Sequence, residues 1–186
     1  MGKALFAGVF LVSAVLAHLA TVHAVPGVIM SRAMAVMEAR GAPLHSFALV
    51  PQTTPESQTV VRPSPDLVYS VCRFDLSKTE RVLNIVVGEF DGLSSVSFFD
   101  ARTNNFATRA VPEGVRLQLR LSRAAPDAQT ASEIEVVQAP SDVGLVLIRR
   151  LAPTAAQFAE VEAASRFDMC GPVTQTEAVQ ISGDGE

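Results

Sequence analysis

The chain begins with an apolar segment that has no charged side chain from Ala4 to Met30. As a helix rising about 1.5 Å per residue, the stretch Leu5–Val25 alone would span the roughly 30 Å hydrocarbon core of a bilayer. Pro26-Gly27 disfavours an uninterrupted helix, so we expect the helix to bend or end there and a second piece to run over Val28–Arg40, with Gly41 as its stop. We therefore predict that residues 1–41 form a single-pass membrane anchor followed by a short helix.

A cleaved signal peptide is the alternative interpretation of this segment. Lys3 gives a short basic region, and Val22-His23-Ala24 is an acceptable small-residue cleavage site. The apolar run continues beyond that site to Met30, which favours a retained anchor. His18 and His23 lie about 140° apart around a helix, so we do not expect them to share a face for a metal ion or a haem.

From residue 42 onward, apolar and polar positions alternate with the period of two that is typical of half-buried strands. The clearest case runs from Val115 to Leu121, where every second residue is Val or Leu and the residues between are Arg or Gln. Thr154 and Gln157 form a capping box that predicts a helix to about Met169. The predicted strands are residues 67–76, 81–87, 93–101, 115–121, 132–138 and 143–148.

Short strands with no helix between them predict a mainly β fold, an antiparallel β-sandwich or jelly-roll-like domain over residues 42–172. One C-terminal helix completes it, and residues 173–186 form a polar tail. Residues 143–148 are apolar on both faces, so this strand is expected to be central in its sheet. We interpret Arg149-Arg150, at its end, as a solvated pair or a partner for Asp142.

A proline-flanked turn precedes the longest predicted strand. Pro63 and Pro65 fix φ near −65° and hold the residues before them extended, and Asp66 closes the turn. The even positions from 68 to 76 are apolar or small, whereas Arg73 and Asp75 belong to the opposite face. We therefore expect this strand to bury one face in the core.

Three different groups of motif residues lie along the predicted sandwich. They are Arg62-Pro63, Asp66, Tyr69-Ser70 and Asp75-Leu76-Ser77; Asp100-Ala101, Thr103-Asn104 and Phe106; and Ala139–Asp142 followed by Gly144–Arg149. In this combination they resemble the bacterial family known as domain of unknown function 1254. The sequence departs from the family pattern at Ser64, where the family often has Asn, and at Leu67, where it often has Thr. The resemblance implies a β-rich fold, a short anchored member, and longer relatives that continue into a second domain.

The composition argues against nucleic-acid binding. A net charge of −4, a single Tyr and no Trp give little with which to bind phosphates or stack bases. No cofactor is expected, because the Walker, Gly-x-Gly-x-x-Gly, His-Glu-x-x-His and Cys-x-x-Cys motifs are absent from the sequence.

Cys72 and Cys170 are the only cysteines. Two cysteines in a small domain behind an export-type segment suggest one disulfide and an oxidising compartment; two free buried thiols are the alternative. Because Cys170 is predicted to end the last helix, the bridge would pin that helix to the sheet. The sandwich is then expected in the periplasm, with the anchor in the bacterial inner membrane.

The sequence offers five polar residues as a candidate ligand or turn motif: Arg62, Asp66, Tyr69, Asp100 and Asn104. Gathered at one end of the sandwich, they could bind an anionic or sugar-like ligand. The simpler interpretation is turn chemistry, in which Asp and Asn accept backbone hydrogen bonds and Arg62 pairs with Asp100.

The leading prediction is a non-catalytic envelope protein whose periplasmic sandwich binds a partner protein or a small ligand. A second hypothesis is a hydrolase-like enzyme that uses Asp66, Asp100 and Tyr69, which requires these side chains within about 10 Å of one another. A third is one half of a split complex, docked onto a separate protein that carries the companion domain. His45 is the only histidine outside the apolar segment, so a triad or a His-rich metal site would depend entirely on it, and no metal is predicted.

Overall fold

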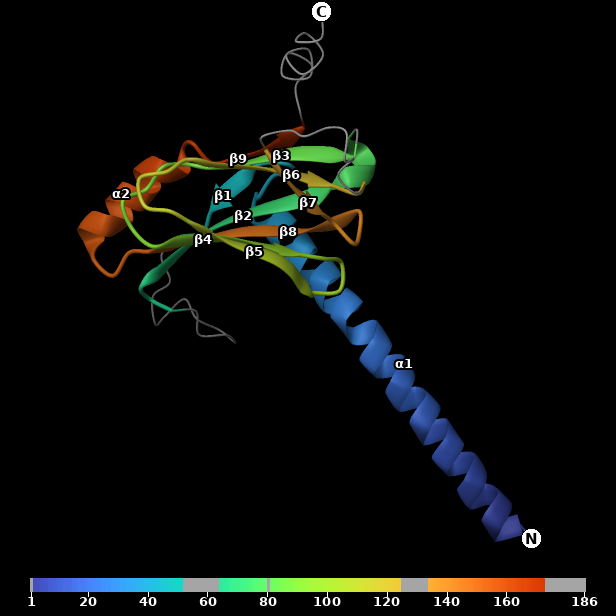
Figure 1. Ribbon diagram of the computed structural model, residues 1–186. Coiled ribbons are helices and arrows are strands. Elements are labelled where there is room, and N and C mark those ends of the chain that lie inside the picture. Colours follow the sequence, from blue (N-terminus) through green and yellow to red (C-terminus); the bar gives the residue numbers. More distant parts are fainter. Residues whose placement is uncertain (1, 52–63, 80, 125–133, 173–186) are drawn as a thin grey trace, which may run out of the picture.

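The fold consists of a long N-terminal helix attached to a two-layered β domain, as the computed structural model shows for residues 2–51, 64–79, 81–124 and 134–172 (Figure 1). The helices are α1 (Gly2–Ala39) and α2 (Ala155–Ser165), with a 3-10 turn at Leu76–Lys78. The strands are β1 (Phe47–Leu49), β2 (Leu67–Asp75), β3 (Val82–Val87), β4 (Ser94–Phe99), β5 (Asn105–Val111), β6 (Leu117–Ser122), β7 (Glu135–Gln138), β8 (Val143–Leu151) and β9 (Met169–Pro172).

The strands form two sheets that enclose one core. Sheet A has the order β1-β2-β8-β4-β5, with β8 in the centre as predicted, and sheet B has the order β7-β6-β3-β9. Among the described strands all neighbouring pairs are antiparallel except β6 and β7, which are parallel. The predicted mainly β sandwich is therefore confirmed, with one parallel pair added. Its core is built from inward side chains of both sheets, including Phe74, Leu83, Ile85, Val87, Val96, Phe98, Leu119, Leu121, Val146 and Ile148.

α1 does not end at Pro26-Gly27, so the prediction of two helical pieces is wrong. The helix continues with Pro26 in its interior. An interior proline costs about 3 kcal/mol or more, whereas starting a new helix with a nucleation constant near 10⁻³ costs roughly 4 kcal/mol. Continuing through one missing hydrogen bond is therefore no more costly than stopping and starting again.

The C-terminus of α1 is where the sequence predicts it. Gly41 has a φ of 83°, which glycine adopts without strain. This conformation brings its N–H to the Glu38 carbonyl at 2.9 Å and the Ala42 N–H to the Met37 carbonyl at 3.0 Å. The two bonds form a Schellman motif and satisfy carbonyls that the helix end would leave unpaired.

The sequence pattern misses two edge strands. β5 lies at the edge of sheet A and exposes most of its side chains at least partly, so its alternation is weak. β9 begins at Met169, up to which the pattern extends the last helix, but α2 ends at Ser165. Pro172 is tolerated in β9 because this strand pairs only with β3 in the described structure and has one side free of ladder hydrogen bonds.

α2 closes one end of the sandwich. Thr154 caps it as predicted, because its Oγ1 accepts a hydrogen bond from the Gln157 N–H at 3.3 Å. Val161 and Ala164 are buried against Val68 and Phe90. The helix is therefore held by a small apolar cluster of its own.

The disulfide between Cys72 and Cys170 is confirmed, with a Cα–Cα distance of 6.4 Å. Cys72 lies in β2 of sheet A and Cys170 in β9 of sheet B. The expectation that the bridge would pin the last helix is wrong, because the chain has already left α2 when it reaches Cys170. The bridge instead ties the two sheets to each other through the core.

Arg150 makes a second connection between the sheets, and its predicted role is wrong. It is not solvated and does not pair with Asp142, which pairs with Arg123 at 2.9 Å. Arg150 lies in β8 and forms a bidentate ion pair with Asp168, with nitrogen–oxygen distances of 2.6 and 2.8 Å. The two side chains are 1% and 0% exposed. The pattern cannot reveal this pair because α2 separates its members along the chain and they meet only when the sheets pack.

Candidate functional site

Asp66 and Asp100 lie at opposite ends of sheet A, so the expectation that the candidate residues gather at one end is wrong. The Asp66 carbonyl accepts a hydrogen bond from the Ala152 N–H at 2.7 Å, just beyond one end of β8. Phe99, next to Asp100, pairs with Leu145 near the other end. At about 3.3 Å per residue, the two aspartates are roughly 26 Å apart along the sheet.

This separation contradicts the hydrolase hypothesis, which needs Asp66, Asp100 and Tyr69 within reach of one substrate. Tyr69 lies in β2 opposite Arg149, and its carbonyl accepts a hydrogen bond from the Val50 N–H at 2.8 Å. Strand register alone decides this outcome. β2 and β4 lie on either side of β8 and start at the same end of it, with Val68 and Ser94 both opposite Arg150, whereas Asp100 follows the far end of β4. Arg62 lies outside the described residues, so its predicted pairing with Asp100 stays a prediction.

Asp100 and Asn104 do come together, in the turn between β4 and β5. One Asp100 carboxylate oxygen accepts hydrogen bonds from the backbone N–H groups of Arg102 at 2.8 Å and Asn104 at 2.9 Å, and the other accepts from the Asn104 amide at 2.8 Å. Thr103, at the tip, has a φ of 65°. The arrangement is that of a rigid Asx-type turn.

The same contacts keep Asp100 ionised. Burial by itself raises the pKa of its carboxyl group, but the hydrogen bonds from Asn104 and Arg102 outweigh burial, so the pKa of Asp100 lies below the ordinary value of 3.8. Because the folded-state pKa of Asp100 is lower than its unfolded-state pKa, the ionised carboxylate stabilises the fold fully at pH values above the unfolded-state pKa. This stabilisation is lost as the pH falls through the folded-state pKa.

We expect Asp100→Asn to destabilise the full chain in detergent micelles by about 1.5 kcal/mol at neutral pH, the contribution of a hydrogen bond to a charged group. The difference from the wild type should shrink between neutral and strongly acidic pH, because the wild-type carboxyl is also protonated once the pH falls through its lowered folded-state pKa. Urea unfolding at both pH values measures this. A difference of the same size at both would show that the charge of Asp100 does not stabilise the turn.

The structure places another junction elsewhere, where the C-terminal part of α1 lies across the outer face of sheet A and packs on it through an apolar cluster (Figure 1). Met30 is 4% exposed and packs with Val71 and Leu145. Met34, Met37, Phe99 and Leu147 add to this cluster. The expectation that β2 buries only one face is therefore incomplete, because α1 covers the other.

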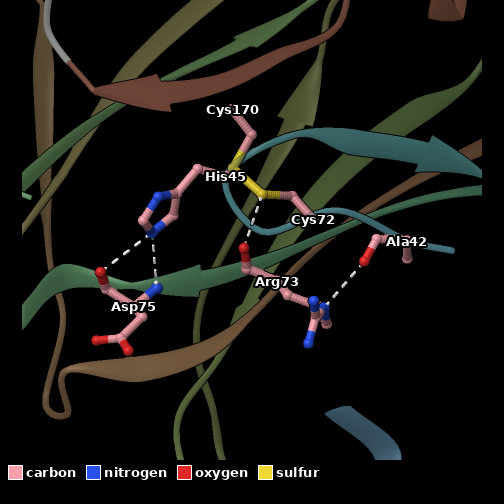
Figure 2. Close-up of a disulfide and its surroundings, with 6 residues drawn as sticks. All are labelled: Ala42, His45, Cys72, Arg73, Asp75 and Cys170. Carbon is pink, nitrogen blue, oxygen red and sulfur yellow. Dashed lines mark hydrogen bonds between the residues drawn. A yellow bond between two sulfur atoms is a disulfide. The ribbon is translucent and has the colours of Figure 1, made fainter. Parts of the chain in front are cut away.

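Arg73 fixes the end of α1 on the sheet. Its Nε donates a hydrogen bond to the Ala42 carbonyl at 3.2 Å (Figure 2). Its Nη1 donates to the Met34 carbonyl at 3.4 Å and to the Glu38 carboxylate at 3.1 Å. The residue is 7% exposed. A cation near the C-terminal end of a helix also complements the negative end of its dipole.

We expect Arg73→Ala to loosen α1 from the sheet by about 2 kcal/mol, because hydrogen bonds to a buried charged group are lost. Hydrogen exchange of amides at residues 30–40 should accelerate, while exchange in the core strands stays unchanged. Lys78→Ala is the matched control: its ion pair with Asp75 leaves the lysine side chain 65% exposed, so an effect below about 1 kcal/mol is expected. Equal acceleration in the core strands would show that Arg73 supports the sandwich and not the helix.

His45 lies close to this junction and supports the end of β2. Its Nε2 accepts a hydrogen bond from the Asp75 N–H at 3.0 Å, with the Asp75 carbonyl oxygen at the same distance (Figure 2). Its backbone N–H donates to the Arg73 carbonyl at 2.9 Å. No group of three His, Cys, Asp or Glu side chains in the described ranges is placed to hold a metal ion.

Two grooves flank α1 where it crosses sheet A. The charged groove has a volume of about 440 Å³; Glu38, Arg73, Asp75 and Lys78 contribute its charges, and most of its other lining residues are apolar. The apolar groove has a volume of about 300 Å³ and is lined by Met30, Ala33, Met37, Phe99, Leu145 and Leu147. Sequence reasoning misses both, because it treats the anchor as separate from the sandwich.

Solved structures include one with a similar fold. A structure of the VPA0106 protein from Vibrio parahaemolyticus is similar with a TM-score of 0.61 at 11% identity, over 82% of this chain and 36% of that one. A putative uncharacterized protein from Burkholderia cenocepacia matches with a TM-score of 0.43 at 16% identity, over 74% and 36%. No curated protein matches. This chain thus covers about a third of the length of each solved relative.

A family model matches residues 44–169, from just after α1 to the first residue of β9. The matched region contains the Asp100–Asn104 turn, Arg73 and the ion pair of Arg150 with Asp168. The chain therefore belongs to the family described as protein of unknown function DUF1254.

Proposed function

We propose that this protein is a single-pass envelope protein of the bacterial inner membrane, whose sandwich lies in the periplasm and binds a partner protein or a small ligand there. One observation supports it above the others: α1 is a single helix with two different environments. Its N-terminal part is apolar and exposed, long enough to cross a membrane, while its C-terminal part packs on sheet A.

The disulfide supports the periplasmic side. Cys72 and Cys170 are 0% and 3% exposed, and disulfides of this kind form in oxidising compartments. A periplasmic sandwich requires the N-terminus on the cytoplasmic side, which agrees with Lys3 ahead of the apolar segment.

The charged groove supports a binding role. It places two carboxylates, Glu38 and Asp75, beside two cations, Arg73 and Lys78. Asp75 is ionised there: burial alone raises its pKa, but hydrogen bonds from Ser77 and Lys78 outweigh burial and lower it. A groove with charges of both signs suits a ligand that carries both an anionic and a cationic group.

Three measurements on cells that produce the full chain test this proposal. N-terminal sequencing of the mature protein should return residues before His23, extraction should need detergent, and a reporter fused after residue 172 should be active in the periplasm. A chain that begins at residue 25 and dissolves without detergent would contradict the anchor and support a cleaved signal peptide. A reporter active only in the cytoplasm would contradict the orientation.

A second proposal is that the sandwich docks onto a protein that carries a companion domain. The observation that favours it is the length of the Vibrio structure, of which this fold matches 36%. Cross-linking in intact membranes followed by detergent purification tests it. The expected partner is a protein that resembles the part of the Vibrio chain outside this match, in a fixed ratio to this protein; recovery of the protein alone at full cross-linking would contradict the proposal.

A further inference from the structure

The turn between β4 and β5 touches α1 well before the helix reaches its docking site on sheet A (Figure 1). The Arg102 guanidinium lies against His23, with its Nη1 3.1 Å from Nε2 and its Nη2 3.3 Å from Nδ1. Nη2 also donates a hydrogen bond to the His23 carbonyl at 3.0 Å. A Cβ at Gly27 would lie 4.0 Å from the Ala101 carbonyl oxygen, so the turn follows the helix at close range.

These contacts set a limit to the part of α1 that a bilayer can surround. Residues 2–25 are exposed, and His23 is the contact nearest to the N-terminus among the described residues. Lys3 and His23 are about 30 Å apart along the helix, which is the thickness of a hydrocarbon core. A bilayer centred nearer to the β domain would bury the Arg102 guanidinium in the hydrocarbon core. At the centre of the core, such a charge costs about 2.5 to 3.5 kcal/mol or more.

We propose that the Asp100–Asn104 turn rests on the outer headgroup layer of the membrane and that Arg102 binds the phosphate of an anionic phospholipid there. This inference depends on the proposed membrane anchor. It adds that no linker separates the sandwich from the lipid surface: one side of the β domain faces the headgroups at a fixed height.

The chemistry of the turn fits this role. A guanidinium has five N–H donors and pairs with phosphate in a bidentate way, and the contacts with His23 leave part of that capacity for a ligand. Asp100, the nearest acidic residue in the sequence, is 8% exposed, and its oxygens are occupied by Arg102 and Asn104. The carboxylate therefore stiffens the turn without presenting its charge to an anionic surface.

The absence of tryptophan from the chain allows a direct test of depth. Two full-length variants, Asn105→Trp and Leu93→Trp, each introduce a single indole, the first next to the turn and the second at the opposite end of β4. Both native side chains are exposed. In vesicles of phosphatidylethanolamine and phosphatidylglycerol with a headgroup-attached quencher, the indole at 105 should be quenched and the one at 93 should not.

A second variant keeps the depth test informative if the tryptophan variant at position 105 does not fold. The described chain has no free cysteine, so Asn105→Cys supplies one thiol for a nitroxide label attached after folding. The label should report contact with the headgroup layer. Equal quenching of the indoles at positions 93 and 105 would overturn the membrane contact. A nitroxide label at position 105 that is fully accessible to water would overturn it as well.

Lipid selectivity tests the assignment of Arg102. In mixed micelles, the ratio of phosphatidylglycerol to phosphatidylcholine retained by the full chain should fall about fivefold in Arg102→Gln, the factor expected for one basic residue at an anionic surface. Arg116→Gln, an exposed arginine near α2, should leave the ratio unchanged. An unchanged ratio in Arg102→Gln overturns the phosphate site.

The outcomes separate this inference from the proposed anchor. A mature chain that begins after His23 refutes the anchor, and the inference with it. A chain that keeps its N-terminus and needs detergent, but shows no quenching at 105, refutes the inference and leaves the anchor intact.

Discussion

Asp168→Asn should lower the free energy of unfolding by about 3 to 5 kcal/mol, because it leaves the Arg150 guanidinium charged and buried without a counterion. The pair is bidentate and almost fully excluded from solvent. The backbone of Gly88 completes the site: its N–H donates to the Asp168 carboxylate at 2.9 Å, and its carbonyl accepts from Arg150 at 3.2 Å. Urea unfolding of the full chain in micelles, followed by circular dichroism, measures the effect.

An exposed ion pair in the same protein serves as the control. Arg109 and Glu135 also connect the two sheets, but their side chains are 42% and 47% exposed, so Glu135→Gln should cost no more than about 1 kcal/mol. The double variant Arg150→Met with Asp168→Leu should be less destabilised than the sum of its single changes, because neither charge remains buried alone. Additive effects would show that the two residues do not act as a pair.

Loss of the disulfide is expected to have an effect of similar size. The double variant Cys72→Ala with Cys170→Ala should unfold at lower urea, with a loss of about 2 to 5 kcal/mol. The two cysteines are 98 residues apart in the sequence, and the chain-entropy model gives about 4.7 kcal/mol for a loop of about 100 residues. Most of that loss acts through the unfolded chain, which becomes free to explore more conformations.

A reducing agent provides the control for the disulfide. Added at a concentration that reduces the unfolded chain, it should shift the urea midpoint of the wild type to that of the double variant and leave the variant unchanged. Because both sulfur-bearing residues are buried, a thiol-specific reagent should label them only after unfolding and reduction. Labelling of the native protein without reductant would show that the bridge does not form in the cell.

The sequence could predict the elements whose residues repeat with a clear period. The charge-free segment over Ala4–Met30 predicts an apolar helix, and Gly41 predicts where it ends. The alternation within 115–121 predicts β6, and the double-sided apolar run over 143–148 predicts the central strand β8. These patterns are local, so tertiary packing does not have to be known to see them.

The same patterns could not predict the edges or the contacts between distant segments. β5 and β9 pair on one side only, so burial leaves little alternation in their sequences. The candidate site was predicted from residues that share a motif, but the antiparallel register separates Asp66 from Asp100. Arg73 and Arg150 look like ordinary strand charges, although each is buried at a junction between elements.

By itself, the sequence determined that this protein combines an apolar N-terminal helix with a β-sandwich that carries two cysteines, because hydrophobic period and cysteine count depend on the chain alone. Only the tertiary structure decided that the helix continues through Pro26 onto sheet A, that Arg150 is buried with Asp168, and that Arg102 meets His23. Each of these depends on which segments the packing of the sheets brings together. The role of a charged side chain depends on the residues that the fold places next to it.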